Sequence, residues 1–388
     1  MSEKTGDGPE AGSETSHKLG QDNITPFGLD IHNPVFLVSS LSIIAFVIVT
    51  LMFQEGATQF FGWLRPFLTS TFDWFFLLSA NLFVVFCLCL MLSPLGKIRL
   101  GGADAKPDYT YIGWIAMLFA AGMGIGLMFF GVSEPMSHFG SAMGGTVVEN
   151  GVRTDWAPLA AAKGDIAAAR DLSMAATIFH WGLHPWAIYA VVGLALAFFT
   201  YNRKLPLTMR SAFYPLFGER IWGWTGHIID TLAVFATLFG LATSLGFGTL
   251  QALGGLNHLF DVPTGNVAKV VLISLITTAA LISVLRGLDG GVKVLSEINI
   301  ALAALLVVFV ILVGPTLTIF ETILSGGITY VKELVPLSMP FGREDANFSQ
   351  GWTSFYWAWW ISWSPFVGMF IARVSRGRTV REFVFCVI

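Results

Sequence analysis

Eight apolar runs, joined by short segments rich in glycine, proline and charge, constrain this chain more than any other feature. A bilayer core about 30 Å thick needs about 20 apolar residues per helix, and a backbone in lipid must satisfy its own hydrogen bonds. Each run therefore predicts a membrane-spanning helix. The runs are 34–54, 72–93, 110–133, 174–200, 226–252, 268–286, 295–320 and 350–373.

The composition agrees with a membrane protein and excludes several function classes. Hydrophobic residues make up 54% of the chain and charged residues only 12%, too few to cover a soluble protein of 388 residues. The net charge is -3, and no basic stripe suits a nucleic acid. Lysine and arginine are about twofold enriched on one set of connecting segments, which predicts a cytoplasmic N-terminus.

The third run contains AAGMGIGLMFFGVSEP, from Ala120 to Pro135, in which Gly122, Gly124 and Gly126 alternate. Each glycine costs a helix up to about 1 kcal/mol relative to alanine, so three together favour an unwound patch. An unwound patch survives in a membrane only where it is buried in protein or lines a cavity. Close helix packing through small residues is the alternative, and the glycines alone do not decide between the two.

Two clusters of aromatic residues lie in the fourth and eighth runs, in FHWGLHPWAIYAV and FYWAWWISWSPFVGMF. At about 100° per residue, four rings of the eighth run fall within roughly 80° of one another, and three rings of the fourth run within about 140°. These rings are Phe355, Trp359, Trp363 and Phe366 in the eighth run, and Trp181, Trp186 and Tyr189 in the fourth.

Two such clusters together with a broken helix predict a common aromatic pocket. Ring faces bind a cation that lacks N–H donors, such as trimethylammonium, at about 0.5–2 kcal/mol per ring. The alternative is that the rings form a belt at the membrane interface or simply pack.

Three polar residues of the third and fourth runs have less certain roles. His180 and His184 have the spacing of two helical metal ligands, but no third ligand is evident, so we expect a packed, hydrogen-bonded pair. Glu134 precedes Pro135 at the end of the third run, where we expect it at the membrane interface in a gating or structural role. No complete catalytic set is evident, so an enzyme is not expected.

GMGIGLMFFGVSEP, FHWGLHPWAIY and FYWAWWISWSPFVGMFIARVSRGRTVREF strongly resemble the betaine/carnitine/choline transporters, from about residue 30 to the end. The resemblance implies an all-α membrane protein, a multi-span helical transporter of the inverted five-helix-repeat, leucine-transporter-like fold with its second repeat incomplete. The expected divisions are a disordered acidic cytoplasmic tail (1–33), two accessory spans (34–93), the first repeat (94–327), an outer connecting segment (328–349) and the first helix of the second repeat (350–388).

The resemblance also implies roles for individual residues. The backbone of Ala121, Gly122 and Met123 would face the substrate carboxylate, and Phe355 would be a gate ring on the outer side. The trimethylammonium cage would consist of Trp181, Trp186, Tyr189, Trp359, Trp360 and Trp363.

Sodium and selectivity positions follow from the same resemblance. Ala120 and Met123 would give carbonyls to one sodium ion, and Thr237 and Phe366 would border another. Gly126 is typical of the sodium-coupled, betaine-transporting branch, whereas choline-transporting, proton-coupled relatives tend to have aspartate there. Leu241 departs from that branch, in which a threonine is expected one turn after Thr237.

The expected function is secondary active import of a quaternary-ammonium solute such as glycine betaine, by sodium symport, in osmoprotection. We expect a homotrimer in the bacterial inner membrane, with no cofactor besides the coupling sodium ion. The alternatives are a choline or carnitine transporter, proton-coupled or an exchanger, and a non-transporting osmolyte sensor. Because the family has twelve spans, we expect this chain to be a fragment or truncated record that does not transport by itself.

Overall fold

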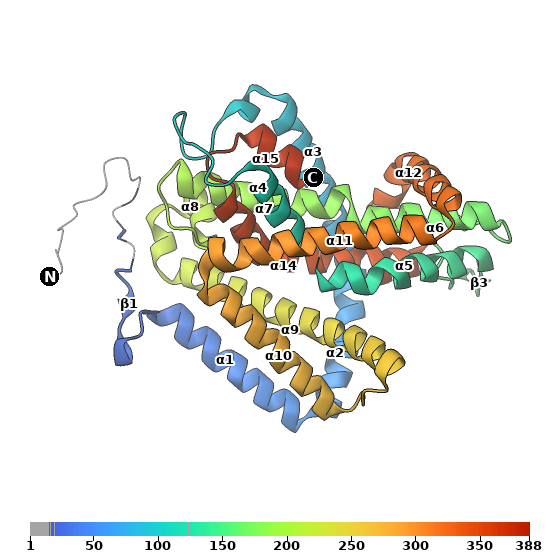
Figure 1. Ribbon diagram of the computed structural model, residues 1–388, viewed down its shortest axis with the longest axis horizontal. Helices are drawn as coiled ribbons and strands as arrows, with labels where there is room; N and C mark the ends of the chain where they lie inside the picture. Colours follow the sequence, from blue (N-terminus) through green and yellow to red (C-terminus); the bar gives the residue numbers. More distant parts are fainter. Residues whose placement is uncertain (1–14, 16, 19, 123) are drawn as a thin grey trace.

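The computed structural model describes residues 15, 17, 18, 20–122 and 124–388 of the chain. In this part of the chain, almost all regular structure is helical (Figure 1). The strands form two small antiparallel hairpins, β1 (Asn23–Ile24) with β2 (Ile31–His32) and β3 (Val148–Glu149) with β4 (Val152–Arg153).

Six helical stretches among the described residues are long and apolar enough to cross a membrane, and a bent pair makes a seventh. The six are α1 (Asn33–Met52), α3 (Asp73–Leu92), α6 (Ile166–Trp181) continued by α7 (Leu183–Tyr201), α9 (Trp224–Phe260), α10 (Asn266–Leu285) and Gly290–Val313, which includes α11 (Lys293–Val313). The bent pair is α4 (Tyr111–Gly122) and α5 (Ile125–Gly144).

The eighth predicted span forms a helix, α14 (Ser354–Val374), which is long enough to cross but is not among the most apolar helices. Its tryptophans, tyrosine and serines lower its mean hydropathy. The aromatic content that marks the predicted site therefore also makes this span less apolar than the others.

Two helices lie where the sequence predicted connecting segments or the end of a span. One is α2 (Gln54–Thr71), between the first two spans. The other is α12 (Thr316–Ser338), so the seventh span ends at Val313, earlier than the predicted residue 320. Gly314 is extended and Pro315 has no N–H to donate, which together separate α11 from α12.

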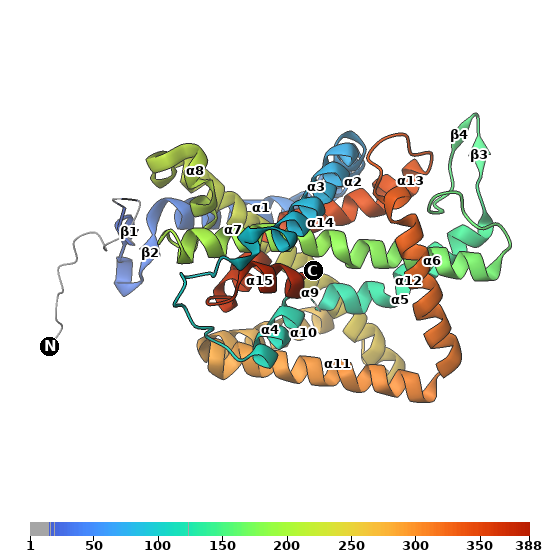
Figure 2. The ribbon, with the colours of Figure 1, turned by 90° about the horizontal axis from the view of Figure 1, so that it is seen from above.

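The longest buried element is the α6–α7 stretch, which Figure 2 shows crossing the molecule as a nearly continuous rod. In its most apolar part 56% of the residues are buried, against 6% in α1 and α10. Helix α14 packs along α7, α12 and α5 pack on α6, and α9 packs on α14. The centre of the molecule therefore consists of α5, α6, α7 and α14, and α1, α10 and α11 leave apolar faces exposed.

The remaining elements connect or cap these helices. They are α8 (Tyr214–Phe217), α13 (Ala346–Phe348), α15 (Val380–Val387), the 3-10 helices Pro26–Gly28, Pro94–Lys97, Met209–Phe213 and Gly218–Trp222, and the π-helical turns Leu288–Val292 and Ser349–Thr353.

A short backbone junction ties the segment before α4 to the segment after α14. The Leu100 N–H donates to the Arg378 carbonyl at 2.9 Å, and the Gly377 and Val380 N–H groups donate to the carbonyls of Leu100 and Ile98, each at 2.8 Å. The indole N–H of Trp114 in α4 adds a bond of 3.0 Å to the Ser375 hydroxyl. These bonds join the start of α4 to the end of α14.

Candidate functional site

A cavity of about 510 Å³ lies where the broken span meets the aromatic helices. Its volume suits a small organic molecule. Its walls come from α4, α5, α6, α7, α9, α14 and the α10–α11 region. The lining residues are Ala120, Ala121, Gly122, Gly124, Gly126, Trp181, Tyr189, Leu241, Ser244, Val284, Val292, Ser296, Trp359, Trp360, Trp363, Phe366, Val367 and Phe370.

The break in the third span lies beside this cavity. Helix α4 ends at Gly122, Gly124 is extended with φ −114° and ψ −154°, and the two halves are bent by 60°. The predicted interruption is therefore present, but Gly126 lies within α5 rather than in the break. Met123, predicted to contact both substrate and sodium, lies outside the described residues.

Gly122 has a packing role that explains why a side chain is absent there. A Cβ atom built on Gly122 would stand 1.8 Å from Cη2 of Trp186, so the indole occupies the space that any side chain would need. Trp186 is thereby held against the end of α4, and its own N–H donates to the Trp181 carbonyl at 3.1 Å. Trp186 supports the cavity wall rather than lining it.

The aromatic residues of the fourth and eighth spans converge around Trp360. Its ring centroid lies 4.8 Å from that of Tyr189, 5.6 Å from that of Trp181 and 6.0 Å from that of Trp186. Trp359 approaches Trp181 at 6.4 Å, with the two rings nearly perpendicular. The structure thus brings both predicted clusters together.

Trp363 also lines the cavity and lies against Gly240 of α9. A Cβ on Gly240 would stand 1.6 Å from Nε1 of Trp363, so the bare glycine is what allows the ring to approach. Thr237, one turn earlier, donates its hydroxyl to the Ala233 carbonyl at 2.8 Å and is not part of the lining. Of the predicted sodium residues in this region, Phe366 does line the cavity, as does Leu241.

Three indole N–H groups of the cavity have no hydrogen-bond partner among the described residues. They belong to Trp359, Trp360 and Trp363, and each nitrogen is buried. A buried N–H without a partner costs about 1–3 kcal/mol, so these indoles are held by ring packing rather than by hydrogen bonds of their own.

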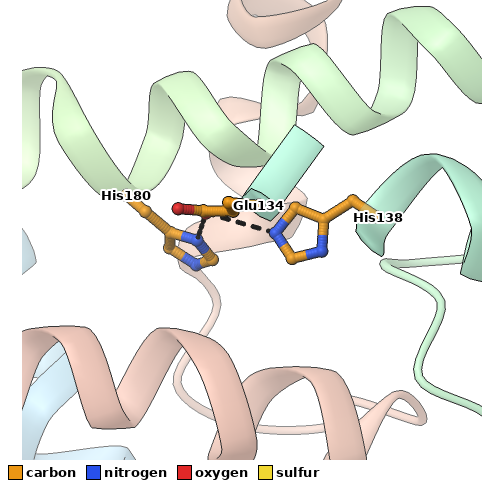
Figure 3. A group of neighbouring side chains, drawn as sticks. All are labelled: Glu134, His138 and His180. Atoms are coloured by element: carbon orange, nitrogen blue, oxygen red, sulfur yellow. Dashed lines mark hydrogen bonds and ion pairs between the residues drawn. The ribbon is translucent and has the colours of Figure 1, made fainter. Parts of the chain in front are cut away.

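Glu134 is fully buried, which corrects the expectation that it is interfacial rather than buried. One carboxylate oxygen accepts bonds from the Trp181 indole N–H at 2.7 Å and the Tyr356 hydroxyl at 2.6 Å. The other is hydrogen-bonded to His180 at 2.6 Å and His138 at 3.2 Å (Figure 3). The carboxylate therefore links α5, α6 and α14 directly behind the cavity wall.

The two histidines expected to form a pair have separate partners. His180 bonds to Glu134 and, through its other nitrogen, to the Thr353 hydroxyl at 2.9 Å, while His184 bonds to Asn81 at 3.0 Å. Glu134, His138 and His180 present ligand atoms within 4.8 Å of one another, the donor set that a Zn²⁺ ion accepts. The three ligand atoms already share hydrogen bonds, whereas Nδ1 of His138 is buried with no partner among the described residues.

Phe355 lies above this cavity rather than in it. Its ring centroid is 6.2 Å from that of Trp359 and 4.4 Å from the guanidinium carbon of Arg65. It lines a second cavity, together with Ser137 and Ser141 of α5 and Trp156 in the loop after β4. This place is compatible with the predicted gate ring.

Comparison with known proteins decides the family. A sequence profile described as betaine/carnitine/choline family transporter matches residues 34–388. The chain belongs to this family of transporters. Its members are transporters and not enzymes.

Individual relatives agree in family and differ in the substrate that their names give. A glycine betaine/proline/choline transporter of Vibrio parahaemolyticus is 63% identical over 389 residues, covering 99% of this chain and 70% of the relative. A second protein of that organism, glycine betaine transporter 1, is 54% identical, with coverages of 96% and 69%. The high-affinity choline transport protein of Escherichia coli is 41% identical, with coverages of 96% and 52%.

The sequence analysis missed the part that two residues play in the site. Glu134 was recognised as a carboxylate but not as the centre of a buried network. Gly240 gave no signal because an isolated glycine in a long helix is common.

Proposed function

We propose that the protein is a secondary active transporter that imports a quaternary-ammonium zwitterion, glycine betaine or a close analogue, by sodium symport. The observation that carries the proposal is the convergence of Trp181, Tyr189, Trp359, Trp360 and Trp363 on one cavity beside a broken span. The names of the Vibrio relatives, which include glycine betaine, support the same substrate class.

The cation would bind among the ring faces. Trimethylammonium has no N–H to donate, so apolar walls satisfy it, and each ring contributes about 0.5–2 kcal/mol. Trp181 and Tyr189 each approach Trp360 and, with Trp359 and Trp363, line the cavity in which such a group would sit. Trp186 would act indirectly, by fixing the Trp181 backbone.

The carboxylate of the zwitterion would face the backbone of Ala121, Gly122 and Met123 at the break in the third span. Choline has a hydroxyl instead of a carboxylate and would interact with this backbone less well.

Sodium would bind at two places around the same cavity. Carbonyls of Ala120 and Met123 would serve one ion at the broken span, and Thr237 and Phe366 would border the other. Oxygen ligands of this kind suit a hard cation. Leu241 stands where a threonine is expected, so the site at Thr237 and Phe366 has one oxygen ligand fewer. We therefore propose that sodium coupling runs mainly through the site at Ala120 and Met123.

The wider features of the family complete the proposal. We place the protein in the bacterial inner membrane with its N-terminus in the cytoplasm, as a homotrimer. Its fold would be the inverted five-helix repeat, with residues 1–33 as a tail, 34–93 as accessory spans, 94–327 as the first repeat, 328–349 as an outer connection and 350–388 as the start of the second repeat.

Choline is the second candidate substrate. The 41% identical Escherichia coli relative is named for it, and its aromatic requirement is the same. Gly126 favours betaine, because its position between Trp181 and Trp359 carries no negative charge to attract a simple cation. A carnitine transporter and a non-transporting osmolyte sensor are further alternatives.

Uptake into proteoliposomes tests the proposal, using the protein expressed from its complete reading frame. Labelled betaine is expected to accumulate with an inward gradient of sodium chloride and not of potassium or lithium chloride. Trp359→Ala and Trp363→Ala are each expected to weaken betaine affinity at least tenfold, as removal of about 1.4 kcal/mol does. Unchanged affinity in both variants would contradict the cage. Binding without uptake would favour the sensor.

A further inference from the structure

Glu134 is a buried carboxylate whose neighbours of possible positive charge are histidines. Its side chain is fully buried, and the two ion pairs that it forms are with His138 and His180. In the part of the chain that the structure describes, no lysine or arginine pairs with it. Buried charges are paired or coordinate metal ions, because an isolated charge in an apolar interior is costly. The carboxylate must therefore be balanced at the two imidazoles, by a proton or by a bound cation.

The three side chains bring their ligand atoms to one place, with Glu134 between the two imidazole rings (Figure 3). Oε1 of Glu134 lies 2.6 Å from Nδ1 of His180 and 3.2 Å from Nε2 of His138, and the three atoms fall within 4.8 Å of one another. A tetrahedral Zn²⁺ ion has bonds of about 2.0–2.2 Å, which keep neighbouring ligand atoms about 3.3–3.5 Å apart. The 2.6 Å contact would have to widen by less than about 1 Å to hold such an ion.

Outer hydrogen bonds hold two of the three ligands in place. The second oxygen of Glu134 accepts the Trp181 indole N–H at 2.7 Å and the Tyr356 hydroxyl at 2.6 Å, so Oε1 is left to face the histidines. Nε2 of His180 lies 2.9 Å from the Thr353 hydroxyl, which can accept its N–H and leave Nδ1 for a metal. Metal-binding carboxylates and histidines almost always have such outer partners.

His138 can present either ring nitrogen to an ion. Its side chain is buried, and Nδ1 has no hydrogen-bond partner among the described residues, so no bond fixes its tautomer. The proton can therefore lie on Nδ1 while Nε2 binds a metal. The ring packs edge-on against Trp352, with centroids 4.8 Å apart, and Trp352 also lines the second cavity. Displacement of the Trp352 ring gives an ion a route from that cavity to the cluster.

We propose that Glu134, His138 and His180 form a Zn²⁺ site that ties α5 to α6. Two imidazole nitrogens and one carboxylate oxygen suit Zn²⁺ better than Mg²⁺ or Ca²⁺, which prefer oxygen ligands. Three protein ligands leave a tetrahedral ion one position for water. Because Trp181 bonds to the same carboxylate, bound Zn²⁺ holds this wall of the aromatic cavity in one position. The site does not depend on which solute the protein carries.

Calorimetric titration with zinc chloride tests the inference, using metal-free protein in detergent, expressed from its complete reading frame. We expect a Zn²⁺ ion that His138→Gln binds at least about 100-fold more weakly, because loss of a ligand should cost more than loss of an outer partner. Thr353→Val removes the outer partner of His180 and should weaken binding about 10- to 100-fold. Magnesium chloride should not bind at this site.

His184→Gln is the matched control, because His184 is an equally buried histidine at the start of α7 whose Nε2 bonds to Asn81 instead. It should bind Zn²⁺ like the unsubstituted protein. Co²⁺ gives a second readout, since the visible absorption of a four-coordinate ion should appear in the unsubstituted protein and in His184→Gln but not in His138→Gln. The thermal-unfolding midpoint without metal shows whether each variant folds, and zinc chloride should raise the midpoint of the unsubstituted protein.

Three results would overturn the inference. They are no Zn²⁺ binding by the unsubstituted protein, the same affinity in His138→Gln, or an equal loss in His184→Gln. Each would leave the cluster as a hydrogen-bonded network that shares a proton. If His138→Gln does not fold, Thr353→Val decides, and an unchanged affinity in that variant would then reject the site.

Discussion

The Glu134 carboxylate accepts the indole N–H of Trp181 at 2.7 Å, so a side chain of the broken span fixes one wall of the aromatic cavity. The bond fixes the plane of the ring as well as its place. The same oxygen holds Tyr356 of α14, so the three elements that surround the cage are connected through one buried carboxylate.

Glu134→Ala should therefore both destabilise the protein and loosen the cage. It leaves the Trp181 N–H and the Tyr356 hydroxyl buried without an acceptor, at about 1–3 kcal/mol for each. We expect a lower thermal-unfolding midpoint in detergent and weaker betaine binding by tryptophan fluorescence. Glu149→Ala, in the exposed β3–β4 hairpin, is the control. Equal midpoints for the two variants would show that the network is not stabilising.

Gly122→Ala should displace Trp186 from the end of α4. The new methyl group would meet the indole at 1.8 Å, and such overpacking costs about 1–3 kcal/mol. Because Trp186 bonds to the Trp181 backbone, we expect betaine affinity to fall about tenfold, measured by equilibrium binding. Gly131→Ala, in the same broken span but with open space around its Cα, should bind normally. Normal betaine binding by both variants would show that the position of Trp186 does not affect the site.

Gly126→Asp should shift selectivity from betaine toward choline. A Cβ there would lie 3.2 Å from Trp359 and 3.4 Å from Trp181, so the carboxylate would enter the cage between two rings. It would attract a simple cation and repel a carboxylate-bearing one. The ratio of choline to betaine uptake measures this. Gly126→Asn, of the same size but neutral, should lower both activities without changing the ratio in favour of choline, and an equal shift in both variants would assign the effect to size.

Acid should weaken the loop that follows the β3–β4 hairpin through Asp155. The Arg153 guanidinium and the N–H groups of Val147 and Ala157 hold the pKa of its carboxyl low, at about 2. Because the folded pKa lies below the ordinary value of about 3.9, the stabilisation is complete above that value and is lost as the pH falls toward 2.

The thermal midpoints of wild type and Asp155→Asn test this loop. Their difference should be constant between pH 7 and pH 5 and should shrink between pH 4 and pH 2. Asp104→Asn, at an exposed carboxylate before α4, gives the effect of removing a surface charge alone. If the difference between the two midpoints grew as the pH fell, the ionised Asp155 carboxylate would not be the group that stabilises the loop.

The sequence predicted the aromatic walls because each cluster lies within one helix, where helical periodicity alone determines which rings share a face. The break near Gly122 was likewise predictable, since glycine acts locally. The environment of Glu134 was not, because its partners Trp181 and Tyr356 lie 47 and 222 residues away in the chain and only packing brings them together. The contact of Gly240 with Trp363 depends on packing in the same way.

Some helix boundaries also depend on packing between distant segments and could not be predicted from the local sequence. The spans were located from apolar length, but α12 begins at Thr316 within a run that was assigned to the seventh span. Composition does not change sharply there, and only the extended Gly314 and the following proline mark the separation. Whether an apolar run continues straight or turns depends on what it packs against, which in α12 is α6.

The junction at Leu100, Gly377 and Val380 has a mechanical consequence. It ties the start of α4 to the end of α14, while the hydrogen bond between Glu134 and Tyr356 ties α5 to the start of α14. The two halves of the interrupted helix, α4 and α5, are thus both bonded to α14, one near each of its ends. If the protein alternates between two orientations, α4, α5 and α14 would move together as one body. Any change in the angle between α4 and α5 would be confined to the hinge at Gly124.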